Sequence, residues 1–250
     1  MSRKFIAAAA AALALLSTAA PARAETVKNI VIVHGAFADG SGWRRVADIL
    51  GKDGYAVSVV QEPLTSLADD VAAAKRVLEM QQGPTLLVAH SYGGVVITEA
   101  GNAPNVVGLV YIAAFIPDKG ESAVDLLSQA PAANNDMRAT KDDFLYLDPA
   151  AYPADFAADL RPAQAKFMAY SQPMLAKASG GGRVTAAAWH QKKSWALIAT
   201  HDHNINPDLE RKMARRAGSE TIEVPGSHAV YASKPTEVAR FIERAAKAAQ

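Results

Sequence analysis

The chain has 250 residues, half of them hydrophobic, which is enough to bury the core of one domain or of one domain with an insertion. Its 26 basic and 25 acidic side chains leave a net charge of +1, so no basic surface for nucleic acid is predicted. Cysteine is absent, which excludes disulfides, thiolate metal sites and a cysteine nucleophile.

The first 24 residues are predicted to form a secretory signal peptide. A basic start is followed by an apolar run over residues 5–16 and by small residues before a cleavage site between Ala24 and Glu25. The run is too short to span a bilayer comfortably, although a retained N-terminal anchor is the alternative. We therefore expect an exported protein, periplasmic or secreted, whose mature chain carries a slightly negative net charge and no membrane anchor.

From residue 29 onward, short apolar runs alternate with segments of helical periodicity. Strands are predicted at residues 29–33, 55–60, 84–88 and 106–112, with helices at 43–50, 67–78 and 95–100 between them. Continuous apolar runs are typical of parallel strands that are covered on both faces. The alternation of strand and helix therefore predicts a parallel sheet wrapped by helices.

The pattern changes between about residues 117 and 190. Strand patterns disappear, alanine and proline become frequent, and the glycines at 180–182 indicate a flexible joint. Phe144, Leu145 and Tyr146 are too apolar for a disordered linker. We expect a mostly helical cap insertion over the carboxyl edge of the sheet.

The alternation then resumes and completes the fold. A strand is predicted at 194–199, a helix at 207–217, a strand at 220–224 and a last helix that is capped near Ser233. The predicted fold class is α/β: a doubly wound, mostly parallel sheet of about six strands with a mostly helical cap insertion. One domain over residues 25–250 contains both parts.

Residues 89–94, Ala-His-Ser-Tyr-Gly-Gly, lie between a predicted strand and a predicted helix. A serine between small residues at such a junction is typical of a nucleophile elbow, although Ala89 replaces the usual first glycine. The elbow would expose the Ser91 hydroxyl and direct the backbone N–H of Tyr92 to the same point. His90 is expected to point away and to be structural. The motif is frequent by chance, so the rest of the chain must support it.

Two further loops after predicted strands carry residues that nucleophilic catalysis needs. Ser91 requires a base, His228 can accept its proton, and Asp202 can orient the imidazole. The loops after parallel strands meet at one edge of a sheet, and the order Ser, Asp, His is that of α/β hydrolases. Asp208 is an alternative acid, but its position at a helix start favours capping.

The sequence His201-Asp202-His203 also allows a metal site. Histidines two residues apart can meet on one face of a strand, but in a loop this pattern is weak evidence. We expect no metal and no cofactor. His34, which ends the first predicted strand, is expected to pack and to shape the following loop.

The chain resembles the α/β-hydrolase superfamily over its whole mature length, and within it the bacterial relatives of the plant methylesterase and hydroxynitrile lyase branch. Residues 33–43, 89–94 and 226–230 and the Asp202 loop carry this resemblance. It implies that Ser91 is the nucleophile, Asp202 the acid and His228 the base. It also implies an oxyanion hole formed by the backbone N–H groups of Ala36 and Tyr92.

The expected activity is that of a serine hydrolase that acts on small carboxylic esters through an acyl-enzyme intermediate. The alternatives are a C–C lyase like the hydroxynitrile lyases, a ligand-binding scaffold without activity, or acyl chemistry on lactones, thioesters or amides. Resemblance to the lyases implies a lysine after the catalytic histidine and a threonine after the histidine that ends the first strand. Ala229 and Gly35 stand there instead. The sequence predicts neither the natural substrate nor the oligomeric state.

Overall fold

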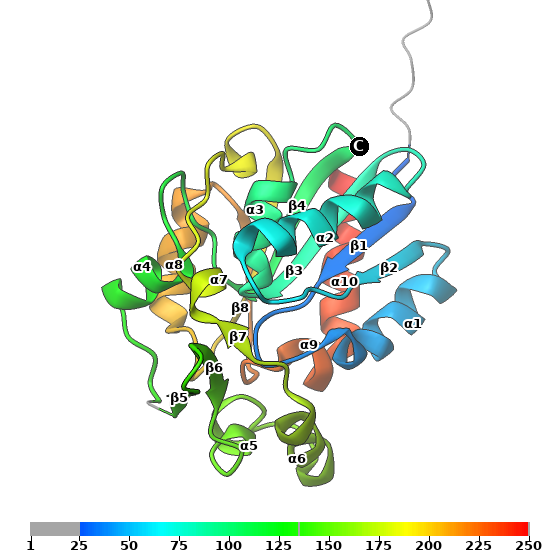
Figure 1. The fold of residues 1–250 in the computed structure, drawn as a ribbon. Coiled ribbons are helices and arrows are strands. Elements are labelled where there is room, and N and C mark those ends of the chain that lie inside the picture. The colour runs from blue at the N-terminus through cyan, green and yellow to red at the C-terminus, as the bar shows by residue number, and fades with distance from the viewer. Residues whose placement is uncertain (1–25, 135, 250) are drawn as a thin grey trace, which may run out of the picture.

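The computed structural model describes residues 26–134 and 136–249, so the predicted signal peptide lies outside the described residues. The centre of the fold is a six-stranded sheet in the order β2-β1-β3-β4-β8-β9 (Figure 1). All neighbouring strands in this sheet are parallel. The strands are β1 (Asn29–Val33), β2 (Ala56–Val60), β3 (Thr85–Ser91), β4 (Val106–Ala114), β8 (Lys193–Ala199) and β9 (Glu220–Val224). The predicted fold class is confirmed.

The two central strands that lead to the site are buried along their whole length. Every residue of β1 and of β3 is buried, as the unbroken apolar runs predict for strands covered on both faces. Their register places Val33, the last residue of β1, opposite Ala89, and β3 continues two residues further to Ser91. The end of β1 therefore lies beside the end of β3 that carries Ser91.

Helices cover both faces of the sheet. In Figure 1, α2 (Leu67–Glu79) and α3 (Gly93–Ala100) lie in front of the sheet, and α10 (Pro235–Ala248) lies behind it. Outside the cap, the described residues also form the helices η1 (Gly40–Trp43), α1 (Arg44–Lys52), α8 (Pro207–Arg216) and α9 (Val230–Ser233). The last helix is capped by Lys234, in agreement with the predicted cap near Ser233. Ser233 itself ends α9, and its hydroxyl donates to the carboxylate of Asp159.

The segment between β4 and β8 forms the cap over the carboxyl ends of the strands (Figure 1). Its regular structure is mainly helical, as predicted, with α4 (Ala123–Gln129), α5 (Tyr152–Asp155), α6 (Pro162–Ser171), α7 (Lys177–Gly180) and η2 (Ala188–His190). It also contains a three-stranded antiparallel sheet, which the sequence did not predict, of β5 (Met137–Ala139), β6 (Phe144–Leu147) and β7 (Leu175–Ala176). Strands this short do not show a measurable alternation of polar and apolar residues.

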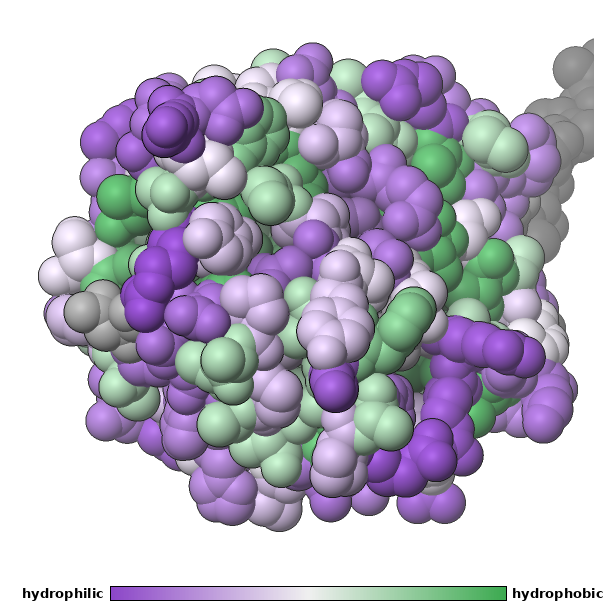
Figure 2. Space-filling model, turned by 60° about the horizontal axis from the view of Figure 1, so that its bottom comes forward, coloured by the Kyte–Doolittle hydropathy of each residue, from purple (hydrophilic) through white to green (hydrophobic). Residues whose placement is uncertain are grey.

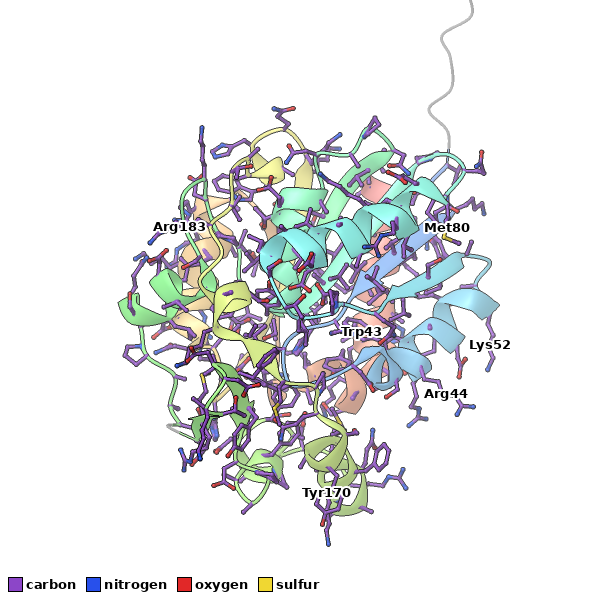
Figure 3. The ribbon with its side chains drawn as sticks, in the orientation of Figure 1. Trp43, Arg44, Lys52, Met80, Tyr170 and Arg183 are labelled. Carbon is purple, nitrogen blue, oxygen red and sulfur yellow. The ribbon has the colours of Figure 1, made fainter. Side chains whose placement is uncertain are left out.

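Figure 2 shows the face of the molecule that carries the cap, where hydrophobic and hydrophilic side chains are mixed. Phe167 and Tyr170 of α6 are exposed, and Figure 3 shows Tyr170 at the outer end of the cap. Trp43, by contrast, is fully buried and stacks on Tyr231 at a ring distance of 4.7 Å. Among the described residues, no helix has the length and hydrophobicity required to cross a membrane.

Candidate active site

Ser91 stands at the sharp turn between β3 and α3. Its φ of 52° lies in the left-handed region, which a residue with a side chain adopts only under strain. Two glycines follow because the backbone packs so closely here: a Cβ atom at Gly93 would clash with the carbonyl oxygen of His34, and one at Gly94 with that of Phe115. Ala89, the departure from the usual motif, is fully buried within β3. The local geometry is that of a nucleophile elbow.

His228 lies in the loop between β9 and α9 and faces Ser91. Its Nε2 is 2.9 Å from Ser91 Oγ, and the side chain is 1% exposed. Its Nδ1 is 2.5 Å from a carboxylate oxygen of Asp202. Because a carboxylate accepts hydrogen bonds, Nδ1 carries the proton of the neutral ring and Nε2 is left to accept from the serine hydroxyl. The imidazole is therefore in the tautomer that a base for Ser91 requires.

Asp202 is held by the backbone of its own loop after β8. One carboxylate oxygen contacts His228, and the other accepts hydrogen bonds from the backbone N–H groups of Asn204 at 2.7 Å and Ile205 at 2.9 Å. The side chain is buried, so these bonds fix its orientation in a place of low dielectric constant. The structure thus brings Ser91, His228 and Asp202 into one hydrogen-bonded chain.

Asp208, the alternative acid, does not reach the histidine. It lies in the first turn of α8, where its backbone N–H donates to Asn206 and its exposed carboxylate accepts from Arg211 at 2.7 Å. Glu210, two residues later, is buried on the same helix, and sequence reasoning missed it. Burial, and then the negative charge of Asp202, raise the pKa of Glu210 well above its ordinary value. Burial therefore favours the neutral form of the Glu210 carboxyl group.

His90 lies closer to the site than the sequence predicts. It does not line the active-site cavity, but its ring lies 4.5 Å from the ring of His228, and its Nε2 is 2.9 Å from the backbone oxygen of His228. Because that oxygen can only accept, Nε2 carries the proton and donates it. Burial lowers the pKa of His90 well below its usual range, which keeps the ring neutral. His90 therefore supports the loop of His228, in agreement with a structural role.

Ala36 and Tyr92, whose amides are the predicted oxyanion hole, line the same cavity as Ser91 and His228. Tyr92 is the N-cap residue of α3, so its amide lies at the positive end of that helix. Its phenol turns away and donates to Asp70 on α2 at 2.8 Å, while both side chains are buried. Burial, and then the charge of Asp70, raise the pKa of Tyr92, so the phenol stays a donor. This bond anchors the residue that carries the amide.

His34 is buried and contacts the loop after β1, as expected: its Nδ1 is 2.8 Å from the backbone oxygen of Gly35. Its Nε2 accepts from the backbone N–H of Glu62, which follows β2, at 3.0 Å, and burial lowers the pKa of the ring. The Glu62 side chain is fully buried, and neither of its oxygens has a hydrogen-bond partner among the described residues. Burial, and then the charge of Asp70, raise the pKa of Glu62 well above its ordinary value. Sequence reasoning did not find this second buried acid.

The cavity in front of Ser91 is small and apolar. Its volume is about 80 Å³, and the cap contributes Val124, Leu127, Met137 and Leu145 to its walls. Val124 is 52% exposed and Met137 is 43% exposed, which places the mouth of the cavity between α4 and β5. None of the described residues that line it is Asp, Glu, Lys or Arg. The cavity favours uncharged, apolar groups because a charge would lose its hydration there.

The two histidines beside Asp202 are not gathered into a metal-binding cluster. His203 Nδ1 lies 4.0 Å from a carboxylate oxygen of Asp155 in the cap. Within residues 26–134 and 136–249, no group of three or more His, Asp or Glu side chains has the arrangement of a metal site.

A parallel sheet with a serine elbow, and with histidine and aspartate on the loops of the following strands, is the arrangement of the α/β hydrolases. The chain belongs to this family: the model of the alpha/beta hydrolase family matches residues 30–241.

Proteins similar to this chain include one esterase in sequence and a pyrethroid hydrolase in fold. A carbendazim hydrolyzing esterase from Nocardioides sp. (strain SG-4G) is 35% identical over 118 residues, which are 41% of this chain and 48% of the relative. The match thus spans about half the length of that curated relative. A pyrethroid hydrolase from Sphingobium faniae JZ-2 superimposes with a TM-score of 0.76 at 19% identity, over 89% of this chain and 98% of that one. Tomato methylketone synthase I gives a TM-score of 0.79 at 16% identity, over 90% and 100%. The two structural likenesses show the shared fold.

Proposed function

We propose that this protein is a serine hydrolase of small, uncharged carboxylic esters. The observation that carries the proposal is the hydrogen-bonded chain from Ser91 through His228 to Asp202, which opens into an apolar cavity. The esterase and hydrolase relatives support the same class of reaction.

In the proposed reaction, His228 takes the proton of Ser91 as the serine oxygen attacks the ester carbonyl. The backbone N–H groups of Ala36 and Tyr92 stabilise the negative charge on the carbonyl oxygen, and Asp202 stabilises the imidazolium. His228 then protonates the departing alcohol, and an acyl-enzyme on Ser91 remains. Water, activated by His228, attacks this acyl group and releases the carboxylic acid.

A hydroxynitrile-lyase-like activity is the second candidate, and two positions disfavour it. A Cβ atom at Gly35 would lie 2.6 Å from Ser91 Cβ, so the structure leaves no room for the threonine of the lyases. Ala229, in the position of their lysine, is fully buried, and no lysine lies among the described residues that line the cavity. A departing cyanide would thus lack a nearby cation.

Parallel assays of the wild type and Ser91→Ala test the proposal. We expect wild-type hydrolysis of p-nitrophenyl esters with short acyl chains, no cleavage of mandelonitrile above background, and loss of ester hydrolysis in Ser91→Ala. A matched ester with a charged acyl group, such as a succinate half-ester, should be hydrolysed at least about tenfold more slowly, because the cavity offers it no counter-charge. Cyanide release from mandelonitrile that depends on Ser91 would show that the lyase assignment is correct instead.

We also propose that the protein is exported and acts in the periplasm or outside the cell. The basic start, the apolar run of residues 5–16 and the small residues before Glu25 support this proposal.

A further inference from the structure

One short segment of the cap, Tyr152–Asp159, contacts three loops of the proposed site: the loop after β1 that carries Ala36, the loop of Asp202 and the loop of His228. It consists of α5 and the turn that follows, and it lies at the foot of the cap in Figure 1. Neither Tyr152 nor Phe156 lines the cavity, although both are fully buried. Their contacts therefore act on the loops around the site and not on a bound substrate.

The first contact is with the loop that carries the Ala36 amide. The hydroxyl of Tyr152 donates to the backbone oxygen of Phe37 at 2.9 Å. Phe37 has a φ of 63°, so this bond holds a strained backbone in the residue directly after Ala36. Burial raises the pKa of Tyr152 well above its ordinary value, which keeps the hydroxyl a donor.

The second contact is with the loop of Asp202. The side-chain amide of Asn204 donates to the backbone oxygen of Asp155 at 2.9 Å. Asn204 is also one of the two residues whose backbone N–H groups bind the carboxylate of Asp202. The cap thus holds the residue that orients the acid.

The third contact is with the loop of His228, on both sides of the histidine. The backbone N–H of Ala229 donates to Phe156 O at 2.9 Å, and the ring of Phe156 meets the His228 ring edge-on at 4.8 Å. Asp159 accepts from the hydroxyl of Ser227 at 2.5 Å and from its backbone N–H at 3.2 Å. The residues before and after the histidine are therefore both bound to the cap.

We propose that the cap segment Tyr152–Asp159 is a positioning element that sets the geometry of the oxyanion amide, the acid and the base at once. This inference rests on the proposed function, since it concerns the same reaction. A displacement of about 1 Å in such a group costs on the order of 100-fold in rate, so small shifts of these loops are measurable.

Tyr152→Phe tests the contact with the oxyanion loop, because it removes the hydroxyl and leaves the ring. The matched control is Tyr111→Phe, which removes another buried hydroxyl, bonded to Thr98 at 2.9 Å, outside the three loops. The readouts are kcat and KM for p-nitrophenyl acetate and the rate of Ser91 labelling by a fluorophosphonate, with melting temperatures for both variants. We expect a roughly tenfold lower kcat and labelling rate in Tyr152→Phe with KM within about twofold, and no change in Tyr111→Phe.

Asp159→Ala tests the contact with the loop of the base. Its matched control is Ser233→Ala, because Ser233 donates to the same carboxylate at 2.8 Å but does not adjoin His228. We expect kcat to fall roughly tenfold in Asp159→Ala and to stay unchanged in Ser233→Ala. If Asp159 acts through Ser227, the fold decrease in kcat of the double variant Asp159→Ala/Ser227→Ala is smaller than the product of the fold decreases of the two single variants.

The outcomes separate the two proposals. If Ser91→Ala hydrolyses esters at the wild-type rate, the proposed function is overturned. If Ser91 is required but Tyr152→Phe has the same kcat and labelling rate as Tyr111→Phe, and Asp159→Ala has the same kcat as Ser233→Ala, the positioning role alone is overturned. Wild-type protein that neither hydrolyses esters nor is labelled at Ser91 overturns both.

Discussion

Replacing Asp202 by asparagine changes one atom of the carboxylate, and the structure determines which way the new amide must face. One oxygen of Asp202 already accepts from the backbone N–H groups of Asn204 and Ile205 at 2.7 and 2.9 Å. If the amide NH₂ faced these donors, two buried hydrogen bonds would be lost, at about 1–3 kcal/mol each. The NH₂ therefore faces His228 Nδ1 in Asp202→Asn.

This orientation forces the histidine into the wrong tautomer. Nδ1 must then accept a hydrogen bond, so the ring proton moves to Nε2, which faces Ser91 Oγ at 2.9 Å. An imidazole that carries a proton on Nε2 cannot remove the proton of the serine hydroxyl. We expect kcat to fall by about 10⁴-fold, as the wrong tautomer does in serine hydrolases, which corresponds to about 5 kcal/mol of activation free energy.

The assay is the initial rate of p-nitrophenyl acetate hydrolysis, with circular dichroism and melting temperature to show that the variant is folded. Asp208→Asn is the matched control, because its carboxylate is exposed and makes a surface ion pair with Arg211. Such pairs contribute little, so the control should stay within about twofold of the wild type. A folded Asp202→Asn enzyme within tenfold of the wild type, or a comparable loss in Asp208→Asn, would refute the assignment of the acid.

Three further results are expected. His228→Ala should lose on the order of 10³-fold or more in kcat and in fluorophosphonate labelling of Ser91, since His228 Nε2 is the base that lies at Ser91 Oγ; normal labelling would contradict this. Burial and the charge of Asp70 raise the pKa of Glu62, so the wild type loses stability as the pH rises above the ordinary value of 4.5 toward the folded-state pKa, by up to about 1.4 kcal/mol per pH unit. Glu62→Gln lacks this titratable group, so the melting temperature of the variant minus that of the wild type should increase between pH 5 and pH 8. If this difference stays constant or decreases, the burial argument is wrong. N-terminal sequencing of the exported protein should begin at Glu25, and a membrane-bound chain that retains residues 5–16 would exclude cleavage.

The sheet and the elbow were predictable because their signals are local. Strands such as β1 and β3 are buried on both faces, so they contain unbroken apolar runs that the sequence shows directly. Parallel strands then bring Ser91, Asp202 and His228 to the same edge, whatever the details of the loops. The topology of the sheet was therefore stronger evidence for the site than any single motif.

The supporting residues were not predictable because their signals depend on packing. Asp208 and Glu210 are two acidic residues in the first turn of the same helix, and the sequence does not distinguish them. Two residues rotate a helix by about 200°, so one side chain is exposed and the other is buried behind Asp202. The cap sheet and the contacts of Tyr152 and Asp159 likewise depend on pairings across long stretches of chain.

Two residues with strained backbone lie beside the cavity, and the cap contacts one of them in addition to lining the cavity. Ser91 and Phe37 both have positive φ, at 52° and 63°, and such strain costs about 1–3 kcal/mol at each position unless the surroundings hold it. The sheet holds Ser91, whose register partner is Ala114 and whose backbone oxygen accepts from Phe115 N at 3.2 Å. Phe37 lies beyond the end of β1, and its backbone oxygen is bound by Tyr152 of the cap. The sheet therefore holds Ser91, the proposed nucleophile, whereas the backbone of Phe37, in the proposed oxyanion loop, is bound by the cap.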